Sequence, residues 1–204
     1  MTEDKFECEL MDWVLFGKLT KRLAKKIKHD GFKPDVIVGL ARGGWVLARL
    51  LCDHIGVKDL VSLKVEHWGI TASPDGQAKL KYLFNIDLTG KKVLLVDDIT
   101  DTGESMRISS EYVKSLNPRE LKSAALRHIK GSKIIPDYFA EEISWRWVVF
   151  PWNYIEDLCN IVHKIIKKKA SSPSEIKMIL KKDFQMDLDE GAIEEILDEM
   201  KHRR

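Results

Sequence analysis

The sequence has little of what marks secreted, zinc-binding or membrane proteins. Its 204 residues include only three cysteines, Cys8, Cys52 and Cys159, which are scattered and form no CxxC pair. This spacing argues against a structural zinc site or a disulfide framework and suits a reducing cytosol. No apolar run approaches the roughly 20 residues that span a bilayer, and the acidic segment 1–9 lacks the pattern of a signal peptide. We therefore expect a cytoplasmic protein that has no membrane partner.

Charge of one sign is not in excess either. Charged residues make up 32% of the chain, but the formal net charge is only +2. No global basic field indicates a nucleic-acid partner, and no acidic excess indicates disorder. The basic runs 18–28 and 164–169 lie in segments with helical apolar periodicity, which is typical of solvated helix faces. With 44% hydrophobic residues, the chain can bury one sizeable core and carry a small appendage.

The apolar pattern predicts strands that alternate with helices. Short β-branched runs indicate buried strands, and apolar residues recurring every three or four positions indicate helices. This alternation predicts the α/β class, with a mostly parallel central sheet flanked by helices, whose ligands bind at the carboxyl ends of the strands. The predicted helices are 10–29, 44–55, 104–116 and 153–168, and the predicted strands are 36–38, 61–65, 93–96, 121–126 and 147–150.

Two segments fall outside this alternation. Residues 66–81 have no period and carry many turn formers, as expected of a lid over a ligand site. Residues 170–204 contain two capping patterns, one starting at Ser172 and one at Asp187, each followed by an apolar helical stripe. We therefore predict a main domain at 1–169 and a helical hairpin at 170–204 that packs on the main domain or on a twin subunit.

The segment 93–105 carries the most chemistry. A buried strand ends in the carboxylates of Asp97 and Asp98, and Asp101 then precedes a Thr-Gly-Glu-Ser sequence at a helix start. Gly103 permits close approach of the backbone to a ligand, and the hydroxyls and helix-start amides can cradle a phosphate. The carboxylates upstream can bond sugar hydroxyls or help to hold Mg²⁺.

Three other interpretations of this segment explain less of it. An EF-hand calcium loop needs a glutamate at its twelfth position, where this chain has Ile108 or Ser109. A phosphorylation receiver domain places its acidic pair early in the chain and does not account for the hydroxyl-glycine loop. A solvated acidic turn does not require two acids at the end of an apolar strand.

The segment resembles the phosphoribosyl pyrophosphate motif of type I phosphoribosyltransferases. The resemblance implies that the acidic pair bonds the ribose hydroxyls, directly or through Mg²⁺, and that the loop holds the 5′-phosphate. It also implies that Asp101 is the catalytic proton acceptor for a purine. Glu104 occupies a position that the family leaves variable, where its charge opposes a phosphate unless the side chain points away. The residues implied to bind phosphoribosyl pyrophosphate are Asp97, Asp98, Thr100, Asp101, Thr102, Gly103, Glu104 and Ser105.

A second segment supports the resemblance. Ala41, Arg42 and Gly43 follow the first predicted strand and lead into a helix, so that a glycine-flanked arginine suits an oxyanion. The segment lacks GxGxxG spacing, and a dinucleotide-binding fold is therefore not supported. It resembles the family's pyrophosphate-binding loop, with Arg42 as the basic residue.

A third segment, 136–152, is rich in aromatic residues, whose faces can stack on a base. It resembles the hood of the 6-oxopurine phosphoribosyltransferases, which implies that Trp147 stacks on the base and that Val148 contacts it through its backbone. Family members use a lysine before this segment to bond the purine 6-oxo group, and we assign Lys130, with Arg127 and Lys133 as alternatives. Trp152 is assigned to core packing.

Together these segments, which cover roughly residues 10–165, predict a 6-oxopurine phosphoribosyltransferase. Its substrates would be phosphoribosyl pyrophosphate and hypoxanthine, guanine or xanthine, and it would form a homodimer or a higher oligomer. One alternative is a phosphoribosyltransferase that acts on adenine or a pyrimidine. The other is a sensor of phosphoribosyl pyrophosphate on the same fold, with the C-terminal hairpin as its output module.

Overall fold

The computed structural model describes residues 5–66, 79–168 and 172–203. These residues fall into two compact units. One, here called the sheet unit, holds the described residues from 14 to 145, and the other, the terminal unit, holds 5–13 together with the described residues from 146 onward. Each unit is described by itself.

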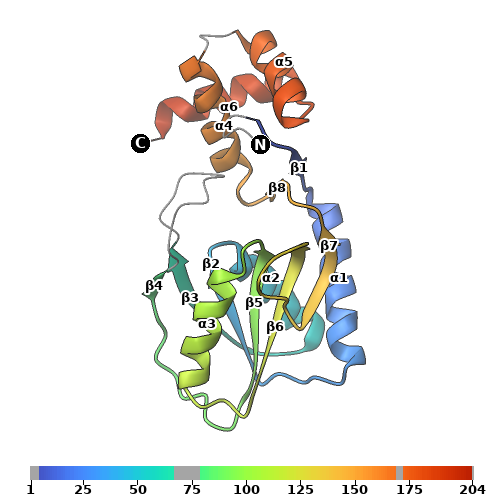
Figure 1. Cartoon of the computed structure of the whole chain (residues 1–204), viewed down its shortest axis with the longest axis vertical. Coiled ribbons are helices and arrows are strands. Elements are labelled where there is room, and N and C mark those ends of the chain that lie inside the picture. The colour runs from blue at the N-terminus through green and yellow to red at the C-terminus, as the bar shows by residue number, and fades with distance from the viewer. Residues whose placement is uncertain (1–4, 67–78, 169–171, 204) are drawn as a thin grey trace. The chain divides into compact units, whose positions relative to one another are not determined.

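The sheet unit is built on six strands in the order β4-β3-β2-β5-β6-β7 (Figure 1). All neighbouring strands are parallel except β3 and β4, which form an antiparallel pair at one edge. The strands are β2 (Val36–Ala41), β3 (Asp59–Glu66), β4 (Lys79–Tyr82), β5 (Lys92–Thr100), β6 (Glu120–Ile129) and β7 (Tyr138–Ile143).

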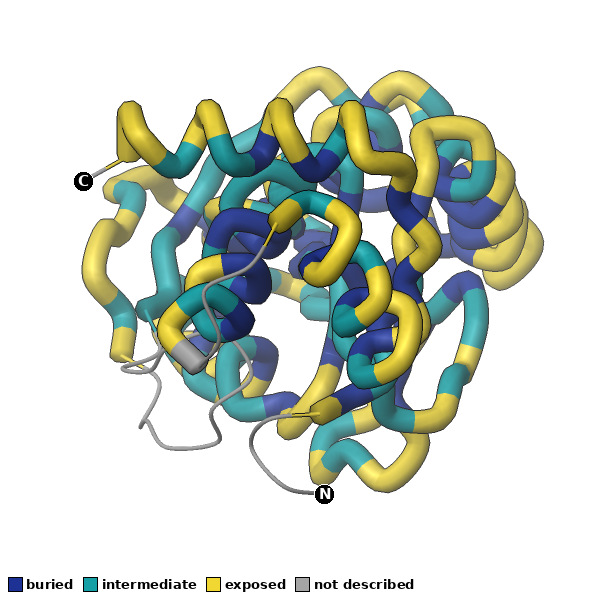
Figure 2. The backbone as a smooth tube through the Cα atoms, turned by 90° about the horizontal axis from the view of Figure 1, so that it is seen from above, coloured by how far each residue is buried: buried dark blue, intermediate teal, exposed yellow. Residues whose placement is uncertain are grey.

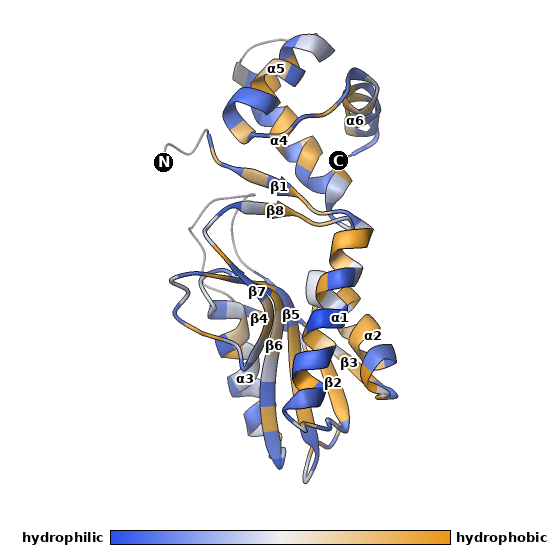
Figure 3. Cartoon of the chain, turned by 90° about the vertical axis from the view of Figure 1, so that its right-hand side faces the viewer, coloured by the Kyte–Doolittle hydropathy of each residue, from blue (hydrophilic) through white to orange (hydrophobic). Residues whose placement is uncertain are grey.

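Helices cover both faces of this sheet. Helix α3 (Glu104–Ser115) lies on one face, and α1 (Trp13–His29) and α2 (Gly43–Ile55) lie on the other (Figure 3). A parallel sheet covered in this way must be apolar on both faces, which is why its central strands read as continuous apolar runs. The α/β class and the mostly parallel sheet predicted from the sequence are confirmed.

The core under α3 is formed by alternate residues of the central strands. Because successive side chains of a strand point to opposite faces, every second residue of β2 and β5 enters this core. Burying each such side chain contributes about 1.5–3 kcal/mol relative to exposure. The buried members are Val36, Val38, Leu40, Leu63, Leu88, Val93, Leu95, Met106 and Val113.

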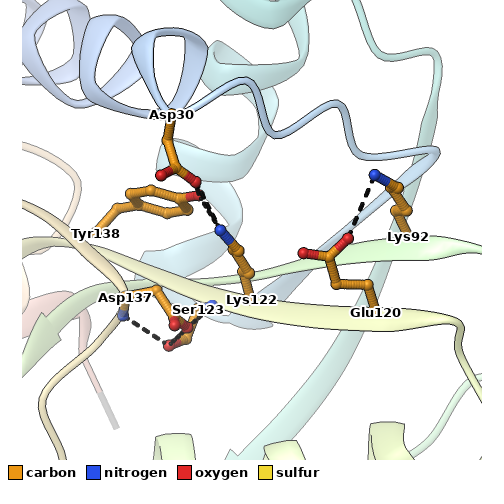
Figure 4. A network of polar contacts seen from close by, with 7 residues as sticks. All are labelled: Asp30, Lys92, Glu120, Lys122, Ser123, Asp137 and Tyr138. Carbon is orange, nitrogen blue, oxygen red and sulfur yellow. Dashed lines mark hydrogen bonds and ion pairs between the residues drawn. The ribbon is translucent and has the colours of Figure 1, made fainter.

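A polar network joins the amino ends of the last two strands, at the opposite edge from the segment 97–105 (Figure 4). Lys122 of β6 donates to Asp30, which follows α1, at 2.6 Å and to the Tyr138 hydroxyl at 2.9 Å. The Tyr138 hydroxyl itself donates to Asp30. The hydrogen bonds from Lys122 and Tyr138 hold the pKa of Asp30 below its ordinary value.

The terminal unit combines a short parallel strand pair with three helices. Strand β1 (Cys8–Leu10) pairs with β8 (Trp147–Val149). Helices α4 (Tyr154–Lys168), α5 (Pro173–Phe184) and α6 (Glu190–His202) pack on one another. Along α6, which ends beside the C label in Figure 2, buried and exposed residues alternate at helical spacing.

Four details differ from the sequence-based expectation. β8 forms where a strand was predicted, but it pairs with β1 rather than joining the central sheet. β1 and β7 were not predicted. Of the predicted lid 66–81, residue 66 ends β3, residues 67–78 lie outside the described residues, and 79–81 belong to β4. The capping box at Ser172 is present, but Asp189 rather than Asp187 caps α6, because its carboxylate accepts from the Ala192 N–H at 2.8 Å.

The proposed division at residues 169 and 170 stays a prediction. In the described part of the chain, no helix combines the length and the apolar character that crossing a membrane requires.

Candidate functional site

The acidic pair lies near the carboxyl end of β5, inside the strand rather than after it. Asp97 pairs in register with Ala125 of β6, and the ladder continues to Thr100. The Asp98 N–H donates to Asp97 Oδ1 at 3.0 Å, and the Ile99 N–H donates to Asp98 Oδ1 at 2.9 Å. These backbone bonds orient both carboxylates at the edge of the sheet where parallel α/β proteins bind ligands.

The surroundings of Asp97 disfavour its charged form. Burial raises its pKa well above the ordinary value, and the neighbouring charge of Asp98 raises it further. Both causes disfavour the ionised carboxylate, and a bound cation or a set of hydroxyl donors would offset them. A carboxylate with a raised pKa beside a second carboxylate, at the carboxyl ends of parallel strands, makes this pair a candidate ligand site.

The loop after β5 is only three residues long and leads directly into α3. Gly103 precedes the helix with φ of 84°, in the left-handed region that favours glycine, and offers no side chain of its own to cap the helix start. A Cβ atom at this position would lie 2.6 Å from Cβ of Ile134, so a larger residue would displace the 130–135 loop. The Glu104 N–H faces the Thr102 hydroxyl at 3.3 Å. Helix starts of this kind can bind anions, and the predicted anion cradle stays a prediction.

Thr100 and His128 form a buried pair behind the loop. Each is 2% exposed, and the Thr100 hydroxyl lies 2.9 Å from His128 Nδ1. The Thr100 side chain therefore faces β6, and its predicted part in binding phosphoribosyl pyrophosphate stays a prediction. The His128 ring packs on Phe139 of β7 at 5.2 Å between centroids.

Arg42 stands at the carboxyl end of β2, next to a small pocket. The pocket has a volume of about 270 Å³ and is lined by Ala41, Arg42, Lys64, Val65 and Glu66. Arg42 is exposed, and the peptide bond before it is cis. The predicted oxyanion loop therefore borders a concave, mostly charged surface.

Gly44 brings this loop and the acidic pair together. A Cβ atom at Gly44 would lie 2.6 Å from the Val96 carbonyl oxygen and 3.0 Å from Asp97 Oδ1. Only a residue without a side chain lets the start of α2 approach β5 this closely. The two segments singled out in the sequence thus meet at one edge of the sheet, although more than fifty residues separate them.

The three cations considered for the base differ in their surroundings. Arg127 is buried, with 4% exposure, and pairs with Glu141 of β7 at 2.6 Å. Lys130 is exposed on the turn after β6, where its backbone N–H donates to the Ile143 carbonyl at 2.9 Å. Lys133 is also exposed, and its backbone N–H donates to the Thr102 carbonyl at 3.3 Å. Lys130 and Lys133 therefore have side chains that solvent and a ligand can reach.

Trp147 and Val148 lie in β8 of the terminal unit, so their predicted contact with a base stays a prediction. Trp147 is half-buried, and its indole N–H is enclosed without a hydrogen-bond partner among the described residues. Trp152 stacks on Phe150 at 4.8 Å between ring centroids, in keeping with its assignment to packing.

Fold and site together define a parallel α/β protein with a candidate site for an anionic ligand at the carboxyl edge of its sheet. A family model described as the phosphoribosyl transferase domain matches residues 9–157. The chain belongs to this family.

Individual relatives agree with the family assignment. The chain is 33% identical over 109 residues to a hypoxanthine-guanine phosphoribosyltransferase from Aquifex aeolicus, and this match spans 50% of the chain and 60% of that relative. A purine phosphoribosyltransferase structure from Pyrococcus horikoshii superposes with a TM-score of 0.62 at 31% identity, covering 72% of this chain and 94% of that one. A xanthine-guanine-hypoxanthine phosphoribosyltransferase from Helicobacter pylori shares the fold, with a TM-score of 0.63 at 23% identity over 77% and 99% of the two chains.

The structure adds residues to the site that the motifs did not indicate. Lys64 and Glu66 line the pocket beside Arg42. Arg107, one turn into α3, binds the Glu104 carboxylate. The i,i+3 spacing of that pair is visible in the sequence, whereas the place of Lys64 depends on the order of the strands.

Proposed function

We propose that this protein transfers the 5-phosphoribosyl group of phosphoribosyl pyrophosphate to a 6-oxopurine, giving a nucleoside monophosphate and pyrophosphate. The observation that carries the proposal is the meeting of the acidic pair, the anion cradle and the Arg42 loop at one edge of the sheet. Membership of the family supports phosphoribosyl transfer. The relatives named for hypoxanthine, guanine or purine transfer support the choice of base.

Each part of the site has a role in this reaction. The helix start after Gly103 binds the 5′-phosphate, together with the hydroxyls of Thr102 and Ser105. Asp97 and Asp98 bond the ribose hydroxyls. Arg42 binds the diphosphate and stabilises the negative charge that grows on it as it leaves.

Mg²⁺ fits this site as a partner of the substrate rather than as a resident metal. Among residues 5–66, 79–168 and 172–203, no group of three or more His, Cys, Asp and Glu side chains is placed to hold a metal ion. Two adjacent carboxylates, one with a raised pKa, would instead share a cation with the oxygens of the ligand. Bound Mg²⁺ would neutralise charge on the diphosphate.

The reaction replaces one bond to the anomeric carbon with another. The bond to the diphosphate oxygen breaks, the bond to a purine imidazole nitrogen forms, and that nitrogen gives up its proton. Asp101 is exposed in the loop beside the anion cradle and accepts this proton in our proposal. Fixing the sugar by its phosphate and its hydroxyls lets base and anomeric carbon meet in line.

Recognition of the base completes the proposal. Trp147 stacks on the purine, the Val148 backbone contacts its edge, and Lys130 bonds the 6-oxo group. Lys130 is favoured because it is exposed at the carboxyl end of β6, whereas Arg127 is buried against Glu141.

A spectrophotometric assay with a panel of bases tests the function. The protein is mixed with Mg²⁺, phosphoribosyl pyrophosphate and one of hypoxanthine, guanine, xanthine, adenine, uracil or orotate. We expect turnover of at least one 6-oxopurine and none of uracil or orotate. Turnover of adenine or a pyrimidine alone would refute the choice of base. Binding of phosphoribosyl pyrophosphate without turnover of any base would indicate a sensor.

A further inference from the structure

His128 is a buried titratable residue that the proposed mechanism does not use. Among the described histidines it alone is buried, with 2% of its surface exposed. Thr100, which is also 2% exposed, places its hydroxyl 2.9 Å from Nδ1 of the ring, and this distance allows a hydrogen bond in either tautomer. Burying two polar side chains costs free energy, and the hydrogen bond between them offsets that cost.

The pair stands at the end of the β5–β6 ladder. Thr100 and His128 are partners in the strand register, and the ladder ends with them. Asp101, the proposed proton acceptor, is the next residue along the chain and is exposed. Thr100 therefore carries the last buried side chain before the turn 101–103 leads into α3.

The ring of His128 is itself held by its neighbours. Phe139 of β7 packs on it with 5.2 Å between the ring centroids. Lys26 of α1 holds Phe139 in turn, because its Nζ lies 5.0 Å from the centroid of the Phe139 ring and donates to the Phe139 carbonyl at 2.7 Å. A chain of contacts thus runs from α1 through β7 and β6 to the end of β5, and it keeps the imidazole where Thr100 can bond it.

The turn that carries Asp101 has weaker ties of its own. The Lys133 backbone N–H reaches the Thr102 carbonyl at 3.3 Å, and the Glu104 N–H reaches the Thr102 hydroxyl at the same distance. Both distances exceed the ordinary N–H···O distance of about 2.9 Å. Because the β-branched side chain of Thr100 is restricted at χ1, a hydrogen bond at its hydroxyl also restrains the backbone from which the turn starts.

We propose that His128 is a positioning residue for phosphoribosyl transfer, whose hydrogen bond to Thr100 fixes the turn from which Asp101 takes the purine proton. This inference rests on the proposed function and deepens it. His128 touches no substrate, and it acts through Thr100 on the direction of the Asp101 carboxylate. A displacement of about 1 Å at a reacting group can cost about a hundredfold in rate, so a modest loosening of this turn should reduce turnover measurably.

Steady-state kinetics on variants of the pair separates positioning from packing. Thr100→Val keeps the shape and removes the hydroxyl, and His128→Leu removes the ring nitrogens. Each should lower kcat about tenfold while KM for phosphoribosyl pyrophosphate stays within about twofold. His128→Asn places an amide near the position of Nδ1 and should keep kcat within about threefold of the wild type. The double variant Thr100→Val/His128→Leu should be no slower than the slower single variant, because both changes remove the same bond.

The action through Asp101 has its own test. In the background of Asp101→Asn, His128→Leu should not lower the residual rate further. Thr20→Val is the matched control, since it removes a buried hydroxyl that bonds the Phe16 carbonyl at 2.9 Å within α1. It should lower thermal stability as Thr100→Val does and leave kcat unchanged.

An unchanged kcat in either Thr100→Val or His128→Leu would overturn the inference, even if the variant is less stable. A further loss of rate in the Asp101→Asn background would do the same, as would a His128→Asn variant as slow as His128→Leu. Should His128→Leu not fold, Thr100→Val and His128→Asn decide the question. If the wild type forms nucleotide and the pair variants match it, only this inference fails. If the wild type forms no nucleotide, the proposed function fails and this inference falls with it.

Discussion

Arg107 donates two hydrogen bonds to the carboxylate of Glu104, from Nε at 3.0 Å and from Nη2 at 2.6 Å. Its third nitrogen, Nη1, binds Glu111 at 2.6 Å. Glu104 is the first residue of α3, where the 5′-phosphate is proposed to bind, and an unpaired carboxylate there would repel it. The ion pair turns this carboxylate along the helix toward Arg107.

Removing Arg107 should therefore weaken the substrate complex through Glu104. Arg107→Met is expected to raise KM for phosphoribosyl pyrophosphate about threefold, with little change in kcat. Without Arg107, the Glu104 carboxylate loses its cationic partner and repels the 5′-phosphate. The double variant Glu104→Gln/Arg107→Met should return KM to the wild-type value. Steady-state kinetics on both variants checks this. Glu111→Gln is the control, because it removes only the ion pair between Arg107 and Glu111. A double variant as impaired as Arg107→Met would contradict this role.

Asp97 should cost stability in the ligand-free protein. Its folded-state pKa is raised, so the protonated carboxyl is favoured by folding. The contribution of Asp97 to stability is therefore most favourable below its unfolded pKa of about 3.9 and is lost as pH rises through the folded pKa. Asp97→Asn keeps the oxygen that accepts from Asp98 and should stabilise the protein by about 1 kcal/mol at pH 7.

Thermal unfolding across pH checks this sign. The advantage of Asp97→Asn should shrink as pH falls, because the wild-type carboxyl then also becomes neutral. The same variant should lose affinity for phosphoribosyl pyrophosphate. A variant that is less stable than the wild type at pH 7 would show that the Asp97 charge is already compensated in the free protein.

Gly44→Ala should disturb the junction of the Arg42 loop and β5. The added methyl group would meet the Val96 carbonyl oxygen at 2.6 Å, and backbone cannot move aside as a side chain can. We expect a destabilisation of about 1–3 kcal/mol and weaker pyrophosphate binding. Gly17→Ala in α1 is the matched control, since its methyl group would meet no atom within 4 Å. That control should gain about 0.5–1 kcal/mol in thermal or denaturant unfolding.

Much of this fold could be predicted because its central strands are apolar. Residues 36–38 and 93–96 read as buried strands, and the helices that follow them carry clear periodicity. Strand ends were harder to predict: β5 continues through two acidic residues because backbone pairing with β6 persists where the side chains turn polar. Short polar β4 carries almost no local signal, since only its antiparallel partner makes it a strand.

The candidate site also has residues that the sequence indicated and residues that it did not. Gly103 and Arg42 stand in local motifs that the chemistry of anion binding explains, and Asp97 stands in one that the binding of sugar hydroxyls or a cation explains, so the sequence indicated all three. Lys64 enters the site only because β3 lies beside β2, and strand order is a long-range property that local patterns do not encode. The partner of β8 was missed for the same reason.

The polar network of Asp30, Lys122 and Tyr138, at the amino ends of β6 and β7, should contribute to stability alone. Tyr138→Phe keeps the ring but removes the hydroxyl that joins Asp30 and Lys122 (Figure 4). We expect a loss of about 1 kcal/mol in the free energy of unfolding and no change in KM. Tyr82→Phe, at a residue that is 61% exposed, should stay within about 0.5 kcal/mol in the same denaturant titration. A changed KM in Tyr138→Phe would mean that this edge is coupled to the site.

The most direct test of phosphoribosyl transfer to a 6-oxopurine follows the phosphorus atoms. Phosphoribosyl pyrophosphate, Mg²⁺, hypoxanthine and the protein are monitored by phosphorus NMR, with Asp101→Asn run in parallel. We predict that pyrophosphate and a nucleoside 5′-monophosphate appear in equal amounts as hypoxanthine is consumed, and that Asp101→Asn slows both at least about a hundredfold. Pyrophosphate released without nucleotide, or unchanged substrate after prolonged incubation with each of the 6-oxopurines, would contradict the account.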